Sequence, residues 1–540
     1  MLRRNFLRAA IGGMLVVWSA LRSQLSWADS RYAFLHGVAS GDPRDDAILI
    51  WTRVSGALGE RLSVDWQLAS DPQMANILRR GHVRTSRNRD YTVKVDVDEL
   101  PGGTQLYYRF SIEGVVSPIG RTRTLPTGSL QKASFAVVSC SNYPAGFFHA
   151  YREIAARDDI EAVIHLGDYL YEYGPGEYAT EKAEALGRIP DPPNEAVSVD
   201  DYRRRHAQYK TDPDLQAMQA RHPLISVWDD HEIVNDAWRG GGANHNDGEG
   251  RWPRRRDAAI RAYFEWMPIR GEPKGRHTRV FRTFRYGDLL SLIMLDTRLY
   301  GRDRQADADP EDSREAVVKA LANRKRRMLG RRQENWLRKS LQRDADATWQ
   351  VIGQQVMMSP VKAPNLEPIV DPERPSTISR ELLDHNIAMS MDNPPLLLDT
   401  WDGYPAARAD LLGDLEKYAR NPIVLSGDLH TSIAGNLVPD GGSASVAVEF
   451  MAPSVSSPGF GEYLPERRPG ALRDATLALN PALRYMETAR RGWLCMTLTP
   501  LECTAEWHLL DTVHSREYSS TIDRRLVVYA GKLADGLQSV

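Results

Sequence analysis

The sequence predicts two parts, a small β-sandwich domain followed by a larger layered α/β domain. Residues 32–127 contain short strand-like runs separated by turn residues, the pattern of a sandwich. After Ser134 the pattern changes to strands that alternate with helices. Several of these later strands are followed at once by Asp, His, Asn or Cys, at the edge where open α/β sheets bind ligands.

Length and charge limit the possibilities. The chain has 540 residues, and domains usually have about 100–200, so two or more domains are expected. A net charge of −2 gives no support for a nucleic-acid-binding module. The basic runs 203–205 and 254–256 are expected to be solvated faces rather than anion sites. Three cysteines are no disulfide framework; Cys495 and Cys503 either pair across adjacent strands or are buried thiols.

Residues 1–28 are predicted to be a twin-arginine signal peptide. Arg3-Arg4-Asn5-Phe6-Leu7 precedes a moderately apolar run over 9–21, and small residues stand at Ser26 and Ala28 for cleavage. The alternative is a membrane anchor, but Gly12 and Gly13 interrupt the run, which is shorter than the ~20 apolar residues of a span. We therefore expect a periplasmic or secreted protein without a permanent membrane anchor, whose partner during export is the twin-arginine translocase.

In the first domain, 32–127, four runs either alternate apolar and polar residues or are rich in β-forming residues, which predicts strands. Residues 126–129 are the expected linker to the second domain. The predicted strands are 48–52, 62–66, 92–97 and 106–110.

In the second domain, 133–515, short apolar runs predict buried strands and Phe147 to Arg157 predicts an amphipathic helix. The strands are expected at 135–138, 162–164, 224–228, 289–295, 349–352, 423–425, 446–450, 493–498 and 505–510. Residues 516–540 are expected to be a tail or helix. The irregular stretches 177–202 and 360–401 are long enough to be lids or rims.

Five of the predicted strands end in groups able to bind a metal. These groups are Cys140 with Asn142, Asp168 with Tyr171, Asp229-Asp230-His231 with Asn235, Asp296, and Asp428 with His430. Carboxylates gathered at one rim would repel one another, and cations remove that cost. Thiolate, phenolate and imidazole suit a transition metal such as ferric iron, whereas Asp and Asn oxygens suit calcium or magnesium. His231 is placed to protonate a leaving oxygen, and Arg298 and Arg254 to stabilise phosphoryl charge.

These motifs resemble those of PhoD-type alkaline phosphatases, relatives of the purple acid phosphatases within the calcineurin-like metallophosphoesterases. The similarity runs in order through nearly the whole mature chain. Its motifs include 36–43, 51–53, 139–143, 165–172, 228–232, 295–298, 401–404 and 426–430. It implies a four-layer α/β/β/α metallophosphoesterase-like catalytic domain after the β-sandwich, twin-arginine export, and hydrolysis of phosphate monoesters and diesters by metal-activated hydroxide at an iron–calcium centre.

The resemblance also implies ligands. Fe(3+) would take Cys140, Asp168, Tyr171 and His430, and Ca(2+) would take Asp168, Asp230 and Asp428, with Asn235 on this or a second calcium. His231 and Arg298 would be catalytic, and Asn142 and Arg254 would contact substrate. Asp230 and Asp428 stand where other superfamily members have neutral Asn or His, which favours a hard ion there.

Alternatives remain at this stage. Cys140 is otherwise a buried thiol or a nucleophile, although neighbouring carboxylates would raise its pKa. The same centre would serve a phospholipase D-like phosphodiesterase acting on lipid or teichoic-acid-type polymers. A non-catalytic calcium-stabilised surface protein would bind metal without turnover. Among the other histidines, His165 is expected in the core and His206, His222 and His245 at the surface.

Overall fold

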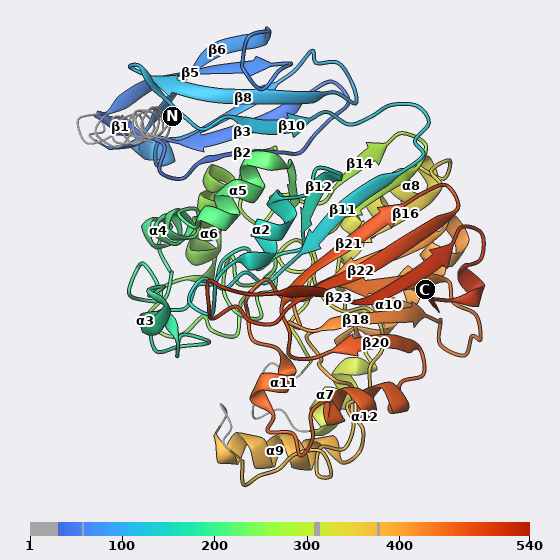
Figure 1. The fold of residues 1–540 in the computed structure, drawn as a ribbon. Helices are drawn as coiled ribbons and strands as arrows, with labels where there is room; N and C mark the ends of the chain where they lie inside the picture. Colours follow the sequence, from blue (N-terminus) through green and yellow to red (C-terminus); the bar gives the residue numbers. More distant parts are fainter. Residues whose placement is uncertain (1–30, 57–58, 307–313, 375–378) are drawn as a thin grey trace, which may run out of the picture.

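The computed structural model describes residues 31–540 except 57–58, 307–313 and 375–378. The predicted signal peptide therefore lies outside the described residues. The strands form a ten-stranded and a seven-stranded sheet, a five-stranded sheet near the N-terminus, and the small pair β1 (Tyr32–Ala33) and β4 (Ser55–Gly56). Figure 1 shows the five-stranded sheet at one end of the molecule, above the mixed α/β part. No helix in the described ranges is long and apolar enough to cross a membrane.

The N-terminal part packs two layers of strands around one apolar core. Its outer sheet has the order β10-β8-β5-β6, with β9 beside β8. These strands are β5 (Arg61–Ala69), β6 (Ile77–Ser86), β8 (Gln105–Ile112), β9 (Val115–Val116) and β10 (Gly120–Arg123), with the 3-10 turn η1 (Arg87–Arg89) after β6. The inner layer is β2 (Val38–Gly41), β3 (Ile48–Arg53) and β7 (Thr92–Val97). Alternating side chains such as Ile48, Val64 and Phe110 fill the space between the layers.

The inner layer is also the end of the ten-stranded sheet, whose order is β24-β23-β22-β21-β11-β12-β13-β2-β3-β7. The junction is the pairing of Gly41 in β2 with Leu224 in β13. The remaining strands are β11 (Ala133–Val138), β12 (Ile160–His165), β13 (Leu224–Ser226), β21 (Gly492–Leu498), β22 (Glu502–Leu510), β23 (Ser520–Tyr529) and β24 (Gln538–Ser539). The expected tail or helix at 516–540 is thus mainly a strand, with the turn η3 (Leu533–Asp535), because β22 offers β23 a free edge.

The seven-stranded sheet has the order β14-β15-β16-β17-β19-β18-β20. Its strands are β14 (Arg282–Tyr286), β15 (Leu290–Met294), β16 (Trp349–Gly353), β17 (Pro422–Ser426), β18 (Ser432–Leu437), β19 (Ala447–Met451) and β20 (Leu483–Glu487). The two large sheets share one core. The rings of Phe135 and Tyr286 meet edge to face at 4.9 Å, and the Trp507 indole donates to the Met451 carbonyl at 3.0 Å.

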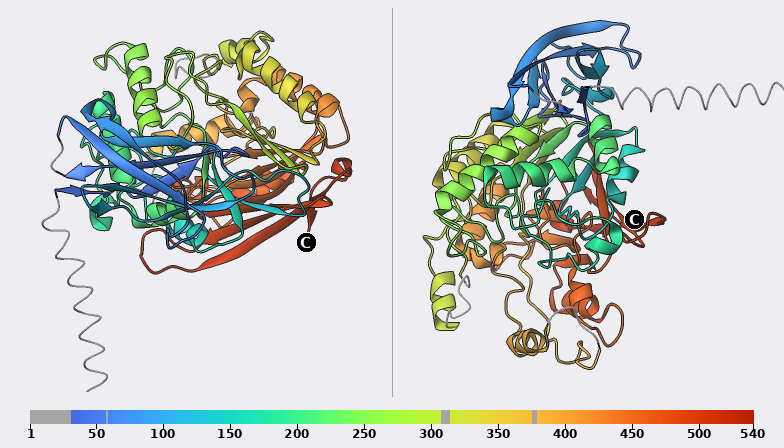
Figure 2. Two further views of the ribbon diagram at one scale, coloured as in Figure 1. Left: turned by 90° about the horizontal axis from the view of Figure 1, so that it is seen from above. Right: turned by 90° about the vertical axis from the view of Figure 1, so that its left-hand side faces the viewer.

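Helices cover both large sheets, as the two views in Figure 2 also show. Leucines of α8 and α10 pack on β15, β16 and β17 in a second core. The helices associated with the ten-stranded sheet are α2 (His149–Ala155), α4 (Val199–Tyr209), α5 (Pro213–Arg221) and α6 (Trp252–Trp266). The others are α3 (Ala183–Leu186), α7 (Arg314–Leu321), α8 (Gly330–Arg343), α9 (Arg380–Ser390), η2 (Trp401–Gly403), α10 (Pro405–Tyr418), α11 (Phe460–Tyr463) and α12 (Ala471–Leu479).

Two expectations about surface residues are wrong. The basic runs are not solvated faces throughout, because Arg205 and Arg255 are buried. The Arg205 guanidinium donates to backbone carbonyls such as Tyr173 O at 2.7 Å. Arg255 forms ion pairs with Glu195 and Glu249. His206 and His222 are also buried, since tertiary packing covers helix ends that look polar in sequence. His165 is buried as predicted.

The three cysteines are free thiols. In the β21–β22 ladder Cys495 lies opposite Glu506 and Cys503 opposite Leu498. Because opposed residues share a face and successive residues alternate, the two thiols point to opposite faces of the sheet. The cross-strand pair considered from the sequence therefore does not form.

Candidate metal centre

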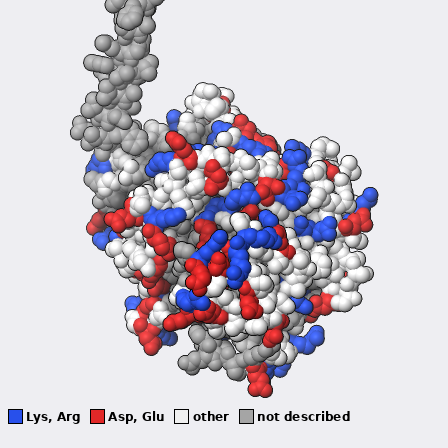
Figure 3. All heavy atoms as spheres, turned by 60° about the horizontal axis from the view of Figure 1, so that its bottom comes forward, with Lys and Arg blue, Asp and Glu red and all other residues white. Residues whose placement is uncertain are grey.

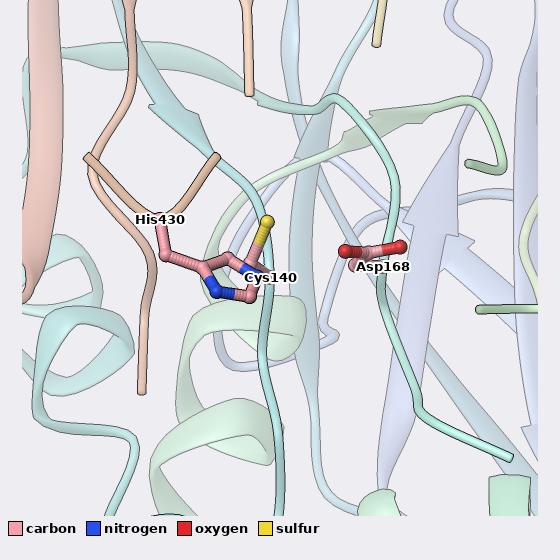
Figure 4. A group of neighbouring side chains, drawn as sticks. All are labelled: Cys140, Asp168 and His430. Atoms are coloured by element: carbon pink, nitrogen blue, oxygen red, sulfur yellow. The ribbon is translucent and has the colours of Figure 1, made fainter. Parts of the chain in front are cut away.

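Three ligand-bearing side chains meet beside the strand ends. Cys140 follows β11, Asp168 follows β12 and His430 follows β17, and one ligand atom from each lies within 4.8 Å of the other two. Figure 4 shows these side chains reaching in from three separate segments. Cys140 and Asp168 are neighbours because β11 and β12 are parallel and end at the same edge of the ten-stranded sheet, whereas His430 comes from the seven-stranded sheet, which shares a core with it.

Two further groups overlap with the first. Asp168, Asp230 and His231 satisfy the same 4.8 Å limit, and so do Asp229, Asp230 and Asp428. Asp168 belongs to two groups and Asp230 to two, so the three groups form one continuous cluster. A carboxylate shared in this way is placed to bridge two cations.

The backbone of this cluster is strained. Cys140, Asp168, Asp428 and His430 all have positive φ values, of 59°, 54°, 70° and 53°. Residues with side chains rarely adopt this left-handed conformation, and it persists only where surrounding contacts enforce it. For Asp168 those contacts come partly from Glu232, whose carboxylate accepts from the Asp168 and Tyr169 amides at 3.0 and 2.8 Å.

Tyr171 and His430 are oriented toward the same space. The Tyr171 hydroxyl donates to Asp168 Oδ2 at 3.0 Å and lies 2.9 Å from His430 Nε2. His430 Nδ1 is 3.0 Å from the Pro458 carbonyl, which can only accept, so Nδ1 carries the proton. Nε2 therefore keeps its lone pair, and burial lowers the pKa of His430 to about 3, which keeps the ring neutral.

His231 is held by a carboxylate. Its Nδ1 lies 2.8 Å from Glu172 Oε2, and its ring stacks on Tyr171 with centroids 4.2 Å apart. Glu172 Oε1 also accepts from the Asn235 backbone amide at 2.7 Å. Burial lowers the pKa of His231, but the charges of Asp230, Glu172 and Asp168 outweigh it and raise that pKa well above its usual value. The nitrogen not bound to Glu172, Nε2, is then a proton donor.

Arg298 occupies a different place from the one expected. Its side chain is fully buried, and its guanidinium binds Asp229, Asp399 at 2.7 Å and Asp428 at 2.9 Å. It is not among the described residues that line the pocket at the cluster, and the groups that it binds are carboxylates. Asp296 in turn accepts from the Arg298 and Leu299 amides at 2.9 Å each, which fixes the turn that carries Arg298.

The residues fit cations. Burial, and next the charge of Asp168, raise the pKa of the Cys140 thiol well above its usual range. Burial likewise raises the pKa values of Asp168 and Asp428, and Asp168 Oδ1 is buried without a hydrogen-bond partner. Arg298 beside Asp428 and His231 beside Asp168 lower these two carboxyl pKa values but do not outweigh burial, so ionising the groups together requires further positive charge. A thiol, a phenol, an imidazole and several carboxylates are the donors that such a charge would bind.

A pocket of about 370 Å³ opens onto the cluster. The described residues that line it include no Lys or Arg, but they include Asp236 and Asp399, which sequence patterns did not single out. Both predicted lid regions contribute residues to the pocket lining: Tyr178 from 177–202, and Leu397, Leu398 and Asp399 from 360–401.

Figure 3 shows acidic and basic side chains interspersed on the face toward the bottom of Figure 1.

The remaining predicted residues are placed as follows. Asn235 and His231 line the pocket. Asn142 is buried near the cluster, and neither its Oδ1 nor its Nδ2 has a hydrogen-bond partner. Arg254 is exposed on α6 and is not part of the pocket lining, because the neighbouring Arg255 and Arg256 are the ones turned inward.

Comparisons with known proteins agree along the chain. Residues 135–507 match the PhoD-like phosphatase family, and residues 19–126 match the PhoD-like phosphatase N-terminal domain. The chain is 33% identical to alkaline phosphatase D of Bacillus subtilis (strain 168) over 530 residues, which cover 95% of this chain and 83% of that protein. A solved structure described as that of PhoD superimposes with a TM-score of 0.82 at 31% identity, covering 95% of this chain and 92% of the other.

Proposed function

The chain belongs to the PhoD-like phosphatase family and is a phosphoric ester hydrolase, and we propose that it works through an iron–calcium centre in the cluster described above. The observation that carries this proposal is the overlap of three ligand groups through Asp168 and Asp230. When bound, two cations would activate water and polarise the phosphoryl oxygens.

We assign ligands by donor chemistry and position. Ferric iron would be held by Cys140, Asp168, Tyr171 and His430, since thiolate, phenolate and imidazole suit a transition metal. Calcium would be held by Asp168, Asp230 and Asp428, with Asn235 at the pocket edge, since hard oxygen donors suit it. Arg298 already binds Asp428 and lies 3.6 Å from Asp230, so it would orient both carboxylates from behind.

His231 would protonate the leaving oxygen. Glu172 fixes its Nδ1, Tyr171 fixes its ring plane, and the side chain lines the pocket. The described residues that line the pocket include no Lys or Arg, so His231 and the cations would neutralise the negative charge of the phosphoryl group.

A specific observation favours diesters as well as monoesters. The residues that line the pocket include the apolar and aromatic side chains Leu397, Leu398, Leu429, Phe460 and Tyr463. These side chains would accommodate an apolar group of a second ester, as in a phospholipase D-like phosphodiesterase.

We also propose that the layers of the catalytic part follow the order α/β/β/α and that the N-terminal part is a β-sandwich.

The test is turnover of a chromogenic phosphomonoester and its diester at alkaline pH, with added calcium and with chelator. We expect calcium-dependent hydrolysis, and a drop in rate of about 10²- to 10⁴-fold in His231→Ala with iron and calcium content unchanged. His277→Ala, at an exposed histidine outside the pocket, is the matched control. An unaffected rate in His231→Ala would show that another group donates the proton.

We propose, finally, that the protein is exported by the twin-arginine translocase to the periplasm or beyond. Arg3-Arg4 and the apolar run after it support this. Replacing both arginines by lysine should leave the protein in the cytoplasm, which fractionation with an immunoblot would measure. Recovery of the double variant in the periplasm would contradict the proposal.

A further inference from the structure

A second group of metal-binding side chains lies on β21 and β22, away from the catalytic cluster. One ligand atom each from Cys495, Glu506 and His508 lies within 4.8 Å of the other two. Cys495 is directly opposite Glu506 in the ladder, and His508 is two residues further along β22, so all three share one face of the sheet. On the neighbouring strand Cys495 pairs with Ala136, which is four residues, or ~13 Å of extended chain, before Cys140.

The geometry between these side chains suits an ion better than a hydrogen bond. His508 Nε2 is buried without a hydrogen-bond partner and lies 3.7 Å from Glu506 Oε2. That separation is too long for a hydrogen bond. It is close to the roughly 3.4 Å expected between two ligand atoms about 2.0–2.1 Å from a tetrahedral zinc.

Neighbouring groups fix the three side chains. Trp493 stacks on the His508 ring, with centroids 4.2 Å apart and planes 14° apart, and its indole donates to Glu153 Oε2 at 2.9 Å. Arg525 binds the other Glu506 oxygen, Oε1, which leaves Oε2 for a ligand. The side chains of Glu506 and His508 are 19% and 13% exposed, so an ion can enter from solvent.

Nearby positive charge does not forbid the site. Burial raises the pKa of the Cys495 thiol, and Arg157, whose Nη2 lies 3.9 Å from the sulfur, partly offsets that rise. The same guanidinium is bound by Asp159 at 2.7 and 2.8 Å, which offsets its charge. A thiolate and a carboxylate together balance one divalent ion.

We propose that Cys495 Sγ, His508 Nε2 and Glu506 Oε2 bind one zinc ion, with a fourth position open to water. Binding releases the thiol proton to solvent. Mixed sulfur, nitrogen and oxygen donors favour zinc over the hard ions expected at the catalytic cluster. The site is independent of the proposed catalytic metals because it shares no residue with them.

The experiment is a titration of the full chain with zinc, and with cobalt as a spectroscopic probe, in a Cys140→Ser background that removes the thiol of the proposed iron site. We expect a thiolate-to-cobalt absorption band, and one zinc equivalent in addition to any bound by the remaining groups of the catalytic cluster. His508→Gln should weaken zinc binding at least about tenfold, and Cys495→Ser should abolish the band. Cys503→Ser is the matched control, since this buried thiol is on the same hairpin but points to the opposite face.

Unchanged zinc affinity in His508→Gln, or a cobalt band retained in Cys495→Ser, would overturn the proposal. If Cys495→Ser does not fold, His508→Gln at the more exposed imidazole still decides the question. Circular dichroism would establish that each variant is folded before titration.

Discussion

At the scale of single residues, the centre depends on conformations that side chains normally avoid. Four predicted ligands have a left-handed backbone conformation: Cys140, Asp168, Asp428 and His430. Each lies a few residues from the end of a strand. Each such residue costs of order 1–3 kcal/mol, so the surrounding structure must compensate. The sequence indicates which residues can bind metal, but not that the chain bends sharply at them.

Arg298 is the residue whose loss should be felt most in stability. Arg298→Met would leave Asp229 and Asp428 buried without their arginine partner and Asp399 with Arg302 alone, and we expect a loss of about 3–5 kcal/mol in the free energy of unfolding. Urea denaturation would measure it. Arg254→Met removes an exposed arginine and should change stability by no more than about 0.5 kcal/mol. Equal stability of the two variants would contradict the role given to Arg298.

The support of His231 is a separate prediction. Glu172→Gln keeps the shape of the side chain but removes the charge that holds Nδ1 and favours the protonated ring. We expect kcat to fall by about tenfold or more with KM little changed, and the acidic proton donor to titrate at lower pH in the kcat profile. A purely structural role would lower stability and leave the pH profile of the remaining activity in place.

At the scale of elements, the stretch that ends at Asp399 connects the long insertion to the centre. Asp399 accepts from Arg298 at 2.7 Å and from Gln305 Nε2 at 2.7 Å, and Leu397 and Leu398 beside it line the pocket. These contacts fix one wall of the pocket, although nothing in the local sequence pattern distinguishes Asp399 from other loop carboxylates.

Asp399→Asn should therefore loosen that wall. We expect a several-fold rise in KM and faster proteolysis within 360–401. The neutral amide of the asparagine cannot form the ion pairs that the Asp399 carboxylate makes with Arg298 and Arg302. Asp384→Asn, on α9 of the same insertion, breaks only an exposed ion pair with Arg380 and is the control. If both variants behave alike, the wall is held by other contacts.

Much of the fold could be predicted because short apolar runs bounded by turns mark buried strands. The runs at 135–138, 349–352 and 423–425 correspond to β11, β16 and β17. β23 was missed because its first half is polar and exposed, and its pairing with β22 decides its structure. The predicted ligands could be found because α/β sheets place ligand sites at the carboxyl ends of their strands. The positions of Glu172, Asp236 and Asp399 near the site depend instead on the conformation of loops, which the local sequence pattern does not predict.

At the scale of the whole molecule, the buried Lys210 and the half-buried Lys94 lie where the N-terminal part meets the catalytic part. Lys210 at the end of α4 is 4.2 Å from the Trp51 ring of β3 and donates to Gln219 at 2.7 Å. Burial lowers its pKa to about 7. Lys94 of β7 donates to the Phe264 and Ile269 carbonyls, and burial lowers its pKa to about 8.

This placement predicts a pH dependence of stability. Between about pH 7 and the ordinary lysine pKa of 10.5, Lys210 is neutral when folded and charged when unfolded. The unfolded state binds more protons there, so stability should rise with pH, with a contribution approaching about 1.4 kcal/mol per pH unit. Unfolding free energies should lose the Lys210 contribution in Lys210→Met, most clearly between about pH 7 and 8, below the window of Lys94, and keep it in Lys339→Met, an exposed control. Parallel profiles would contradict the prediction.

The order of strands in the ten-stranded sheet also bears on how the protein is made. β11 lies between β12 and β21, and its Ser134 meets Thr497 of β21, 363 residues later in the chain. During translation one edge of β11 therefore stays open until nearly the whole polypeptide has left the ribosome, and such distant pairings form slowly. A chain that ends before β21 therefore lacks the strand that covers this edge of β11 in the complete sheet.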